Sequence, residues 1–95
     1  PIFPTVTRDM AIVSDEKVIW ADIKGCIESL KIDCIDGIEF FDVYRGKQIE
    51  KGKKSIAFRL IFRADDRTLK NEEVDALQEK ILENLSNAFG IKLRA

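Results

Sequence analysis

Residues 55–63, Ser-Ile-Ala-Phe-Arg-Leu-Ile-Phe-Arg, form the most regular stretch of the sequence. Every second position is apolar, which is the pattern of a strand that buries one face. The apolar positions are Ile56, Phe58, Leu60 and Phe62. The intervening positions, two of which are arginines, are Ser55, Ala57, Arg59, Ile61 and Arg63. We therefore predict a strand with one core face and one mixed face that meets solvent or a partner.

The stretch before this strand, residues 40–54, reads Phe-Phe-Asp-Val-Tyr-Arg-Gly-Lys-Gln-Ile-Glu-Lys-Gly-Lys-Lys. It predicts a strand over residues 35–44 that opens into a hairpin loop over residues 45–52. The basic residues of this segment are Arg45, Lys47, Lys51, Lys53 and Lys54, and they stand against a single acid in the loop, Glu50. Such a concentration of positive charge favours a polyanionic partner.

Two other segments have the spacing of amphipathic helices. The apolar face of the first, which follows a polar turn at residues 15–17, is Trp20, Ile23, Ile27 and Leu30. The second helix is predicted to begin at Lys70 or Asn71 and to end at Gly90. Its buried stripe is expected to be Val74, Leu77, Ile81, Leu85 and Ala88. We expect Trp20 to lie in or beside the core rather than to serve as a surface for base stacking.

The remaining strands are predicted near the two ends of the chain, over residues 5–14 and 91–94. In the first strand, the even-numbered and the odd-numbered residues, which point to opposite faces, both include apolar and polar side chains. This mixture favours a bulge, or a strand that is partly buried on both faces. Its faces therefore stay unassigned at this point. In the strand over residues 35–44, Phe40 and Phe41 fall on opposite sides.

The predicted order of elements is strand, helix, strand, strand, helix, strand. This order is typical of an α+β domain of the ferredoxin-like, split βαβ (βαββαβ) type, a four-stranded antiparallel sheet with two helices on one face. The opposite face of the sheet is then open, and its cations are Arg59, Arg63, Lys92 and Arg94. The length favours one domain over residues 1–95.

The composition is that of an ordinary soluble globule, with 45% hydrophobic and 35% charged residues. No apolar stretch reaches about 18 residues and no secretory signal is present, so we expect a cytoplasmic protein without a membrane partner. The chain has no histidine, and Cys26 and Cys34 match no common zinc or redox spacing. We therefore expect no catalytic residue, metal or cofactor in this domain. The abrupt start over Pro1 to Pro4 suggests a piece of a longer polypeptide.

Two runs within the basic segment carry a resemblance to a known family. Residues 41–49, Phe-Asp-Val-Tyr-Arg-Gly-Lys-Gln-Ile, and residues 52–55, Gly-Lys-Lys-Ser, resemble the ferredoxin-fold anticodon-binding domain that ends the bacterial phenylalanine–tRNA ligase beta subunit. The likeness covers nearly the whole chain, and its further positions are Pro4, Val6, Arg8, Asp9, residues 67–69 and residues 72–74. It implies a domain that binds the anticodon stem-loop of phenylalanine tRNA.

The same resemblance implies a larger assembly. The chain is then expected to be the C-terminal domain of a longer beta subunit, which joins an alpha subunit in a heterotetramer. In this family the alpha subunit attaches phenylalanine to its tRNA with ATP and magnesium. The domain is thus expected to be part of a ligase without being its catalyst, and we expect no DNA partner.

RNA loops are bound through stacking of unpaired bases and through cationic contacts to phosphates. We assign planar contacts to Tyr44 and Arg45, a base edge to Gln48, and phosphates to the lysines. The candidate tRNA-binding residues are Tyr44, Arg45, Lys47, Gln48, Lys53, Lys54, Arg59, Arg63 and Arg8. Structural alternatives stay open for several of them, since Tyr44 can cap the core at the sheet edge, Arg8 can pair with Asp9, and Gln48 can be an ordinary polar residue of the loop.

The alternative function is a ferredoxin-like regulatory or protein-interaction module without RNA binding. Residues 14–17, Ser-Asp-Glu-Lys, argue against one form of it, an amino-acid sensor, and against a rival of another class, a small hydrolase. This turn lacks the small residues of an amino-acid sensor, and it lacks the arginine-bearing anion loop of an acylphosphatase-like hydrolase. A general RNA-recognition module is disfavoured as well, because residues 55–62 lack its aromatic signature.

Overall fold

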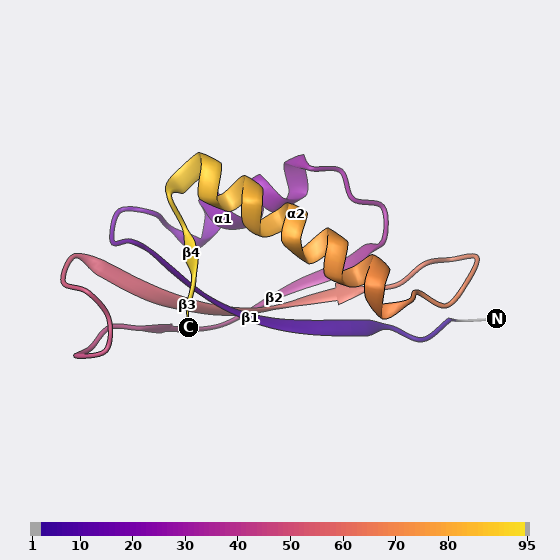
Figure 1. The fold of residues 1–95 in the computed structure, drawn as a ribbon, viewed down its shortest axis with the longest axis horizontal. Helices are drawn as coiled ribbons and strands as arrows, with labels where there is room; N and C mark the ends of the chain where they lie inside the picture. The colour runs from indigo at the N-terminus through magenta and orange to yellow at the C-terminus, as the bar shows by residue number, and fades with distance from the viewer. Residues whose placement is uncertain (1–2, 95) are drawn as a thin grey trace.

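The computed structural model describes residues 3–94, so the expectation about the start of the chain lies partly outside the described residues. The elements are β1 (Val6–Asp15), α1 (Trp20–Ser29), β2 (Ile35–Tyr44), β3 (Lys53–Phe62), α2 (Asn71–Phe89) and β4 (Lys92–Leu93). The strands form a sheet in the order β2-β3-β1-β4, and neighbouring strands are antiparallel. Both helices lie on one side of this sheet (Figure 1). The predicted ferredoxin-like α+β fold is confirmed.

The central strand β3 buries the face that its alternation predicts. Its buried apolar residues are Ile56, Phe58, Leu60 and Phe62. β1 pairs with β3 without a break from Val6 to Asp15, so the bulge considered for the first strand is absent from this ladder. The pairing assigns the faces of β1, because Met10 and Ile12 lie opposite core residues of β3 and are themselves buried.

Each helix adds an apolar stripe to the core. The buried helical residues are Ile23, Ile27, Val74, Ile81 and Leu85. Trp20 lies beside this core, as expected. The centre of its ring is 5.4 Å from the ring centre of Phe40 and 5.3 Å from that of Phe58. The assignment of Ala88 to the stripe is wrong. Ala88 is exposed and Phe89 packs against the core instead, because the last buried positions of α2 follow the i, i+4 spacing.

Helix α2 begins and ends where the sequence predicts. At its start the Lys70 backbone N–H donates a hydrogen bond to the Glu73 carboxylate at 3.2 Å. This bond, reinforced by a second one from Arg67, lowers the pKa of Glu73. At its end Gly90 adopts a left-handed φ of 67° and donates its N–H to the Ser86 carbonyl at 2.8 Å.

The edge strand β2 contains two irregularities, because its pairing with β3 shifts at Asp36 and at Phe41. Phe40 contacts Trp20 on the helix side of the sheet. The Phe41 ring lies on the other side, 4.9 Å from the guanidinium carbon of Arg59. The predicted opposite placement of the two phenylalanines is therefore confirmed. The bulge at Phe41 shifts the register after it, so that Tyr44 lies opposite Ser55.

The two cysteines carry free thiols, and both are half-buried and pack against the core. Among residues 3–94 we find no helix that is long and apolar enough to cross a membrane.

Candidate nucleic-acid interface

The hairpin between β2 and β3 lies at one end of the sheet (Figure 1). Tyr44 is the last residue of β2 and therefore lies at this end. Tyr44 is directly opposite Ser55 in the ladder between β2 and β3, so the two side chains share the open face. Tyr44 is 38% exposed, whereas Ser55 is only 2% exposed. An accessible ring thus stands beside a covered hydroxyl.

Arg94 supplies the cover. It follows β4 at the far edge of the sheet, and its guanidinium carbon lies 5.0 Å from the centre of the Tyr44 ring, within cation–π range. One guanidinium nitrogen donates to Gln48 Oε1 at 3.0 Å, and another donates to Ser55 Oγ at 3.4 Å. We call Tyr44, Gln48, Ser55 and Arg94 the tyrosine–arginine cluster.

The hairpin loop is fixed next to this cluster. Ile49 is buried and its N–H donates to the Gly46 carbonyl at 3.0 Å. A side chain is not tolerated at position 46 without displacing Tyr44, because a Cβ atom there would lie 2.7 Å from Tyr44 Cζ. Gly52 adopts a φ of 86°, and its carbonyl accepts a hydrogen bond from the Glu16 N–H at 3.0 Å.

A cavity of about 550 Å³ opens between the hairpin loop and β4, and Gln48 and Arg94 of the cluster line it. Its apolar wall is formed by Val13, Ile49 and Leu93. The charged residues of its lining are Glu50, Lys53, Lys92 and Arg94. A volume of this size suits a small ligand or a single unstacked base, and the excess of cations suits an attached phosphate.

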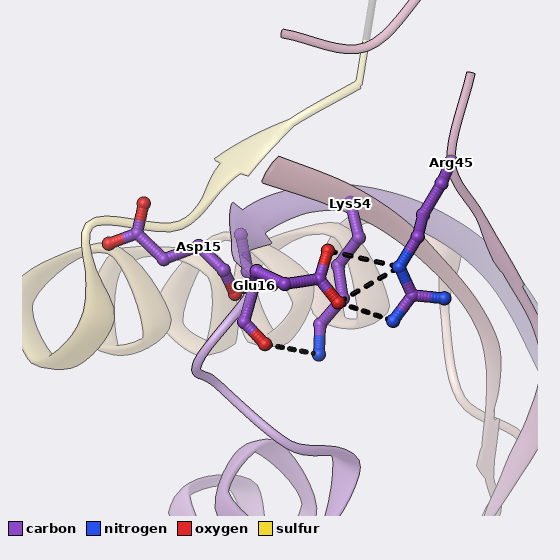
Figure 2. Close-up of polar contacts among 5 residues, drawn as sticks. Asp15, Glu16, Arg45 and Lys54 are labelled. Carbon is purple, nitrogen blue, oxygen red and sulfur yellow. Dashed lines mark hydrogen bonds and ion pairs between the residues drawn. The ribbon is translucent and has the colours of Figure 1, made fainter. Parts of the chain in front are cut away.

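Two acidic residues, Asp15 at the end of β1 and Glu16 in the turn that follows, neutralise the base of the hairpin. Arg45 donates a bifurcated hydrogen bond from Nε to both oxygens of the Glu16 carboxylate, at 2.9 and 3.0 Å, and a shorter bond from a terminal nitrogen (Figure 2). The Lys53 amine lies 2.9 Å from the Asp15 carboxylate. These hydrogen bonds lower the pKa of Glu16 and of Asp15, and they raise the pKa of Arg45 and of Lys53.

Lys54 does not belong to an exposed basic loop. β3 begins at Lys53, so Lys54 is a strand residue on the face that carries Ile56. It is only 6% exposed, and its Nζ donates to the Glu16 backbone carbonyl at 2.9 Å (Figure 2). The predicted exposure of Lys54 is wrong because strand alternation turns its side chain toward the helices.

Arg59 and Arg63 lie on the open face, as predicted, but each has a carboxylate partner. Arg59 Nε donates to Asp9 at 2.7 Å, and this hydrogen bond lowers the pKa of Asp9. A guanidinium nitrogen of Arg63 lies 3.6 Å from Asp36. The partners come from the two strands that flank β3, so the open face is far less cationic than its arginines suggest.

Arg8 lies on the other face of the sheet. Its guanidinium donates to Asp75 of α2 at 2.5 Å and to Gln78 at 3.3 Å. The alternative pairing of Arg8 with Asp9 is wrong, because neighbouring strand residues point to opposite sides and Asp9 bonds Arg59 instead. The structure therefore separates Arg8 from the other candidate residues.

Three cations near the cluster are available to an anionic ligand. Lys47 and Lys51 in the hairpin loop and Lys92 on β4 are exposed. Within the described range, residues 3–94, none of them forms an ion pair.

Comparisons with known proteins identify the family of the chain. The family model described as the ferredoxin-fold anticodon binding domain matches residues 1–94. The chain belongs to this family. Among curated relatives, phenylalanine–tRNA ligase beta subunits from Halalkalibacterium halodurans and Clostridium tetani are 43% and 40% identical over 99% of the chain. The beta subunit from Dechloromonas aromatica is 41% identical over 98% of it. The chain spans 12% of the length of each of these relatives.

Two polar members of the cluster in this anticodon-binding domain were absent from the candidate set, namely Ser55 and Arg94. The alternation of β3 places Ser55 on the open face, but its position opposite Tyr44 depends on a register that the bulge at Phe41 sets. Arg94 reaches the site because β4 pairs with β1, at Ile12 and Val13. Sequence spacing carries no signal for either contact.

Proposed function

We propose that this domain binds unpaired bases of an RNA loop, and specifically the anticodon stem-loop of phenylalanine tRNA. The tyrosine–arginine cluster is the observation that carries the proposal, since it presents an exposed ring, a guanidinium plane and an amide together, with the guanidinium also bonded to the covered Ser55 hydroxyl. Unpaired bases stack on such planes and bond such polar groups through their edges. The family description and the names of the relatives favour tRNA over other polyanions.

Within the cluster, Tyr44 offers the stacking surface and Arg94 a second plane. Gln48 and Ser55 hold the Arg94 guanidinium before any ligand arrives, so less side-chain entropy is lost on binding. The exposed amines of Lys47 and Lys51 then contact the phosphates that flank the stacked base.

The paired cations contribute less than their number suggests. Each of four cations has to break an ion pair with a carboxylate before it can bind a phosphate in its place, namely Arg45, Lys53, Arg59 and Arg63. Because exposed ion pairs are worth only about 0–1 kcal/mol, such an exchange is feasible but gains little. Base stacking, at roughly 1–3 kcal/mol per base, therefore dominates the proposed affinity.

The wider role is part of the same proposal. We place the domain in the beta subunit of a cytoplasmic phenylalanine–tRNA ligase that works with an alpha subunit. ATP and magnesium act elsewhere in that ligase, and this domain holds the tRNA loop without taking part in the chemistry.

The test is a fluorescence-anisotropy titration of the chain with the phenylalanine tRNA anticodon hairpin and with the same hairpin carrying a scrambled loop. We expect a preference for the native loop. Tyr44→Ala should weaken binding of the native hairpin by roughly 1–3 kcal/mol, whereas Tyr44→Phe keeps the ring and most of the affinity. Equal binding of both hairpins would contradict the proposal, and binding of neither would support the interaction module without RNA.

A further inference from the structure

The last residue of β1 and the first residue of the turn that follows it direct two carboxylates to different parts of the hairpin base. Glu16 points toward Arg45, whereas Asp15 points away from it (Figure 2). Asp15 is opposite Lys53 in the ladder between β1 and β3, and its Oδ1 lies 2.9 Å from Lys53 Nζ. Asp15 therefore pairs with a lysine that lines the cavity beside the tyrosine–arginine cluster.

This pairing lowers the positive charge of the cavity lining. Without Asp15, the three cations of the lining would outnumber its single acid by two. The Asp15 carboxylate offsets one of these charges through Lys53. Net positive charge and counterion release are what make a basic surface bind any polyanion. With that attraction reduced, a ligand has to gain affinity from stacking and from hydrogen bonds in the cluster.

We propose that Asp15 is a specificity-determining residue, whose carboxylate competes with RNA phosphate for Lys53 and so disfavours RNA that offers no unpaired base to the cluster. This inference rests on the proposed RNA-binding function. The side chains are accessible for such an exchange, since Asp15 is 58% and Lys53 33% exposed. Exposed ion pairs are weak, so a phosphate held in place by a stacked base can displace the carboxylate.

The substitution Asp15→Asn removes the negative charge of the carboxylate with little change in the shape of the side chain. The amide oxygen still accepts a hydrogen bond from Lys53, and the turn keeps two anchors that do not involve this side chain. These are the Glu16 N–H bond to the Gly52 carbonyl at 3.0 Å and the Lys54 bond to the Glu16 carbonyl at 2.9 Å. Asp15→Ser is a second variant that also removes the charge.

The experiment measures binding of the chain to the native anticodon hairpin, to a fully paired RNA duplex and to heparin, over a salt series. We expect Asp15→Asn to bind the hairpin about two-fold tighter and the duplex and heparin about five-fold tighter, with a steeper salt dependence. The control Glu83→Gln makes the same change in net charge on the exposed surface of α2 and should have no effect. In a Lys53→Gln background, the gain from Asp15→Asn should disappear.

Unchanged or weaker binding of duplex and heparin by both Asp15 variants would overturn the inference. An equal gain in the Lys53→Gln background would overturn it too, because it would reveal a general effect of net charge. The heparin measurement separates this outcome from the proposed function. If the wild-type chain shows no preference for the native hairpin while Asp15→Asn still binds heparin tighter, the RNA function fails and the competition at Lys53 stands.

Discussion

Lys54 and Glu16 are joined by a hydrogen bond from a nearly buried amine to a backbone carbonyl, at 2.9 Å (Figure 2). The bond ties β3 to the turn that follows β1, next to the site where Glu16 also binds Arg45. A lysine in a strongly basic segment is thus part of the framework that shapes the hairpin rather than part of its surface.

The first prediction concerns this framework. Lys54→Met should lower the free energy of unfolding by about 1–2 kcal/mol, because the Glu16 carbonyl loses a charged donor. The salt dependence of RNA binding should stay unchanged in any fraction that is folded. Urea unfolding and hairpin titrations measure the two effects, and a variant with wild-type stability but a shallower salt dependence would return Lys54 to the binding surface.

Lys47 is expected to behave in the opposite way. Lys47→Ala should leave the urea midpoint unchanged, since the side chain is exposed and forms no ion pair within residues 3–94. It should weaken hairpin binding and reduce the slope of log K against log salt by about 0.7, the value for one phosphate contact on a single strand. Lys80→Ala, on the exposed side of α2, is the matched control. A slope equal to that of the control would remove Lys47 from the interface.

Arg94→Lys tests whether the cluster needs a planar guanidinium. Lysine keeps the charge but cannot stack on Tyr44 and donate to Gln48 and Ser55 from a rigid fork. We expect hairpin affinity to fall by about 1–2 kcal/mol, in line with the loss of one stacking plane. Arg63→Lys, on the same open face, should change affinity little. Equal effects of the two substitutions would mean that charge alone matters at Arg94.

Gly46→Ala should displace the Tyr44 ring while changing the stability of the fold only slightly. The added Cβ would lie 2.7 Å from Tyr44 Cζ, so the ring has to leave its present position beside Arg94. We expect weaker hairpin binding with a small change in melting temperature, because the end of one side chain can shift cheaply. Gly25→Ala in α1 has no atom within 4 Å of its new methyl group and should stabilise the helix by about 0.5–1 kcal/mol without affecting binding. Unaltered binding by Gly46→Ala would contradict the assigned role of the ring.

The strands and helices were predictable because periodicity reports burial directly. The alternation of residues 55–63 gave the core face of β3, and the same alternation extended by one residue would have placed Lys54 on that face. The basic composition around Lys54 was a poorer guide, because composition does not specify the side of the sheet to which a side chain points. The prediction for Ala88 failed for another reason. Spacings of three and of four residues are both helical, and only packing selects Phe89.

The electrostatics of the candidate site were not predictable from the sequence. Arg59 is neutralised by Asp9, fifty positions away, and Arg94 reaches Gln48 across forty-six. Counting charges in a segment therefore overestimated the cations that a ligand meets. Such pairings follow from strand order and register, and local sequence patterns report neither of them.

The ion pairs also predict how stability depends on pH. Hydrogen bonds lower the pKa of four carboxyls in the folded chain. The donors are Arg59 for Asp9, Lys53 for Asp15, Arg45 for Glu16 and the Lys70 N–H for Glu73. A carboxyl whose folded pKa lies below its unfolded pKa contributes stability above the unfolded value and loses it as the pH falls through the folded one. We therefore expect the melting temperature to be steady from neutral pH to about pH 5 and to fall below about pH 4.

Added salt should make the acid-induced fall shallower, because these pairs are exposed and screened. Asp9→Asn should lower the melting temperature at neutral pH and reduce the difference between pH 7 and pH 3, since one of the linked carboxyls is gone. The control Asp42→Asn lies on the same face at an exposed position without an ion-pair partner among residues 3–94, and it should leave that difference unchanged. A pH profile of Asp9→Asn that parallels the wild type would show that the pair with Arg59 adds nothing to stability, which would leave Arg59 free to exchange its carboxylate for RNA at no cost.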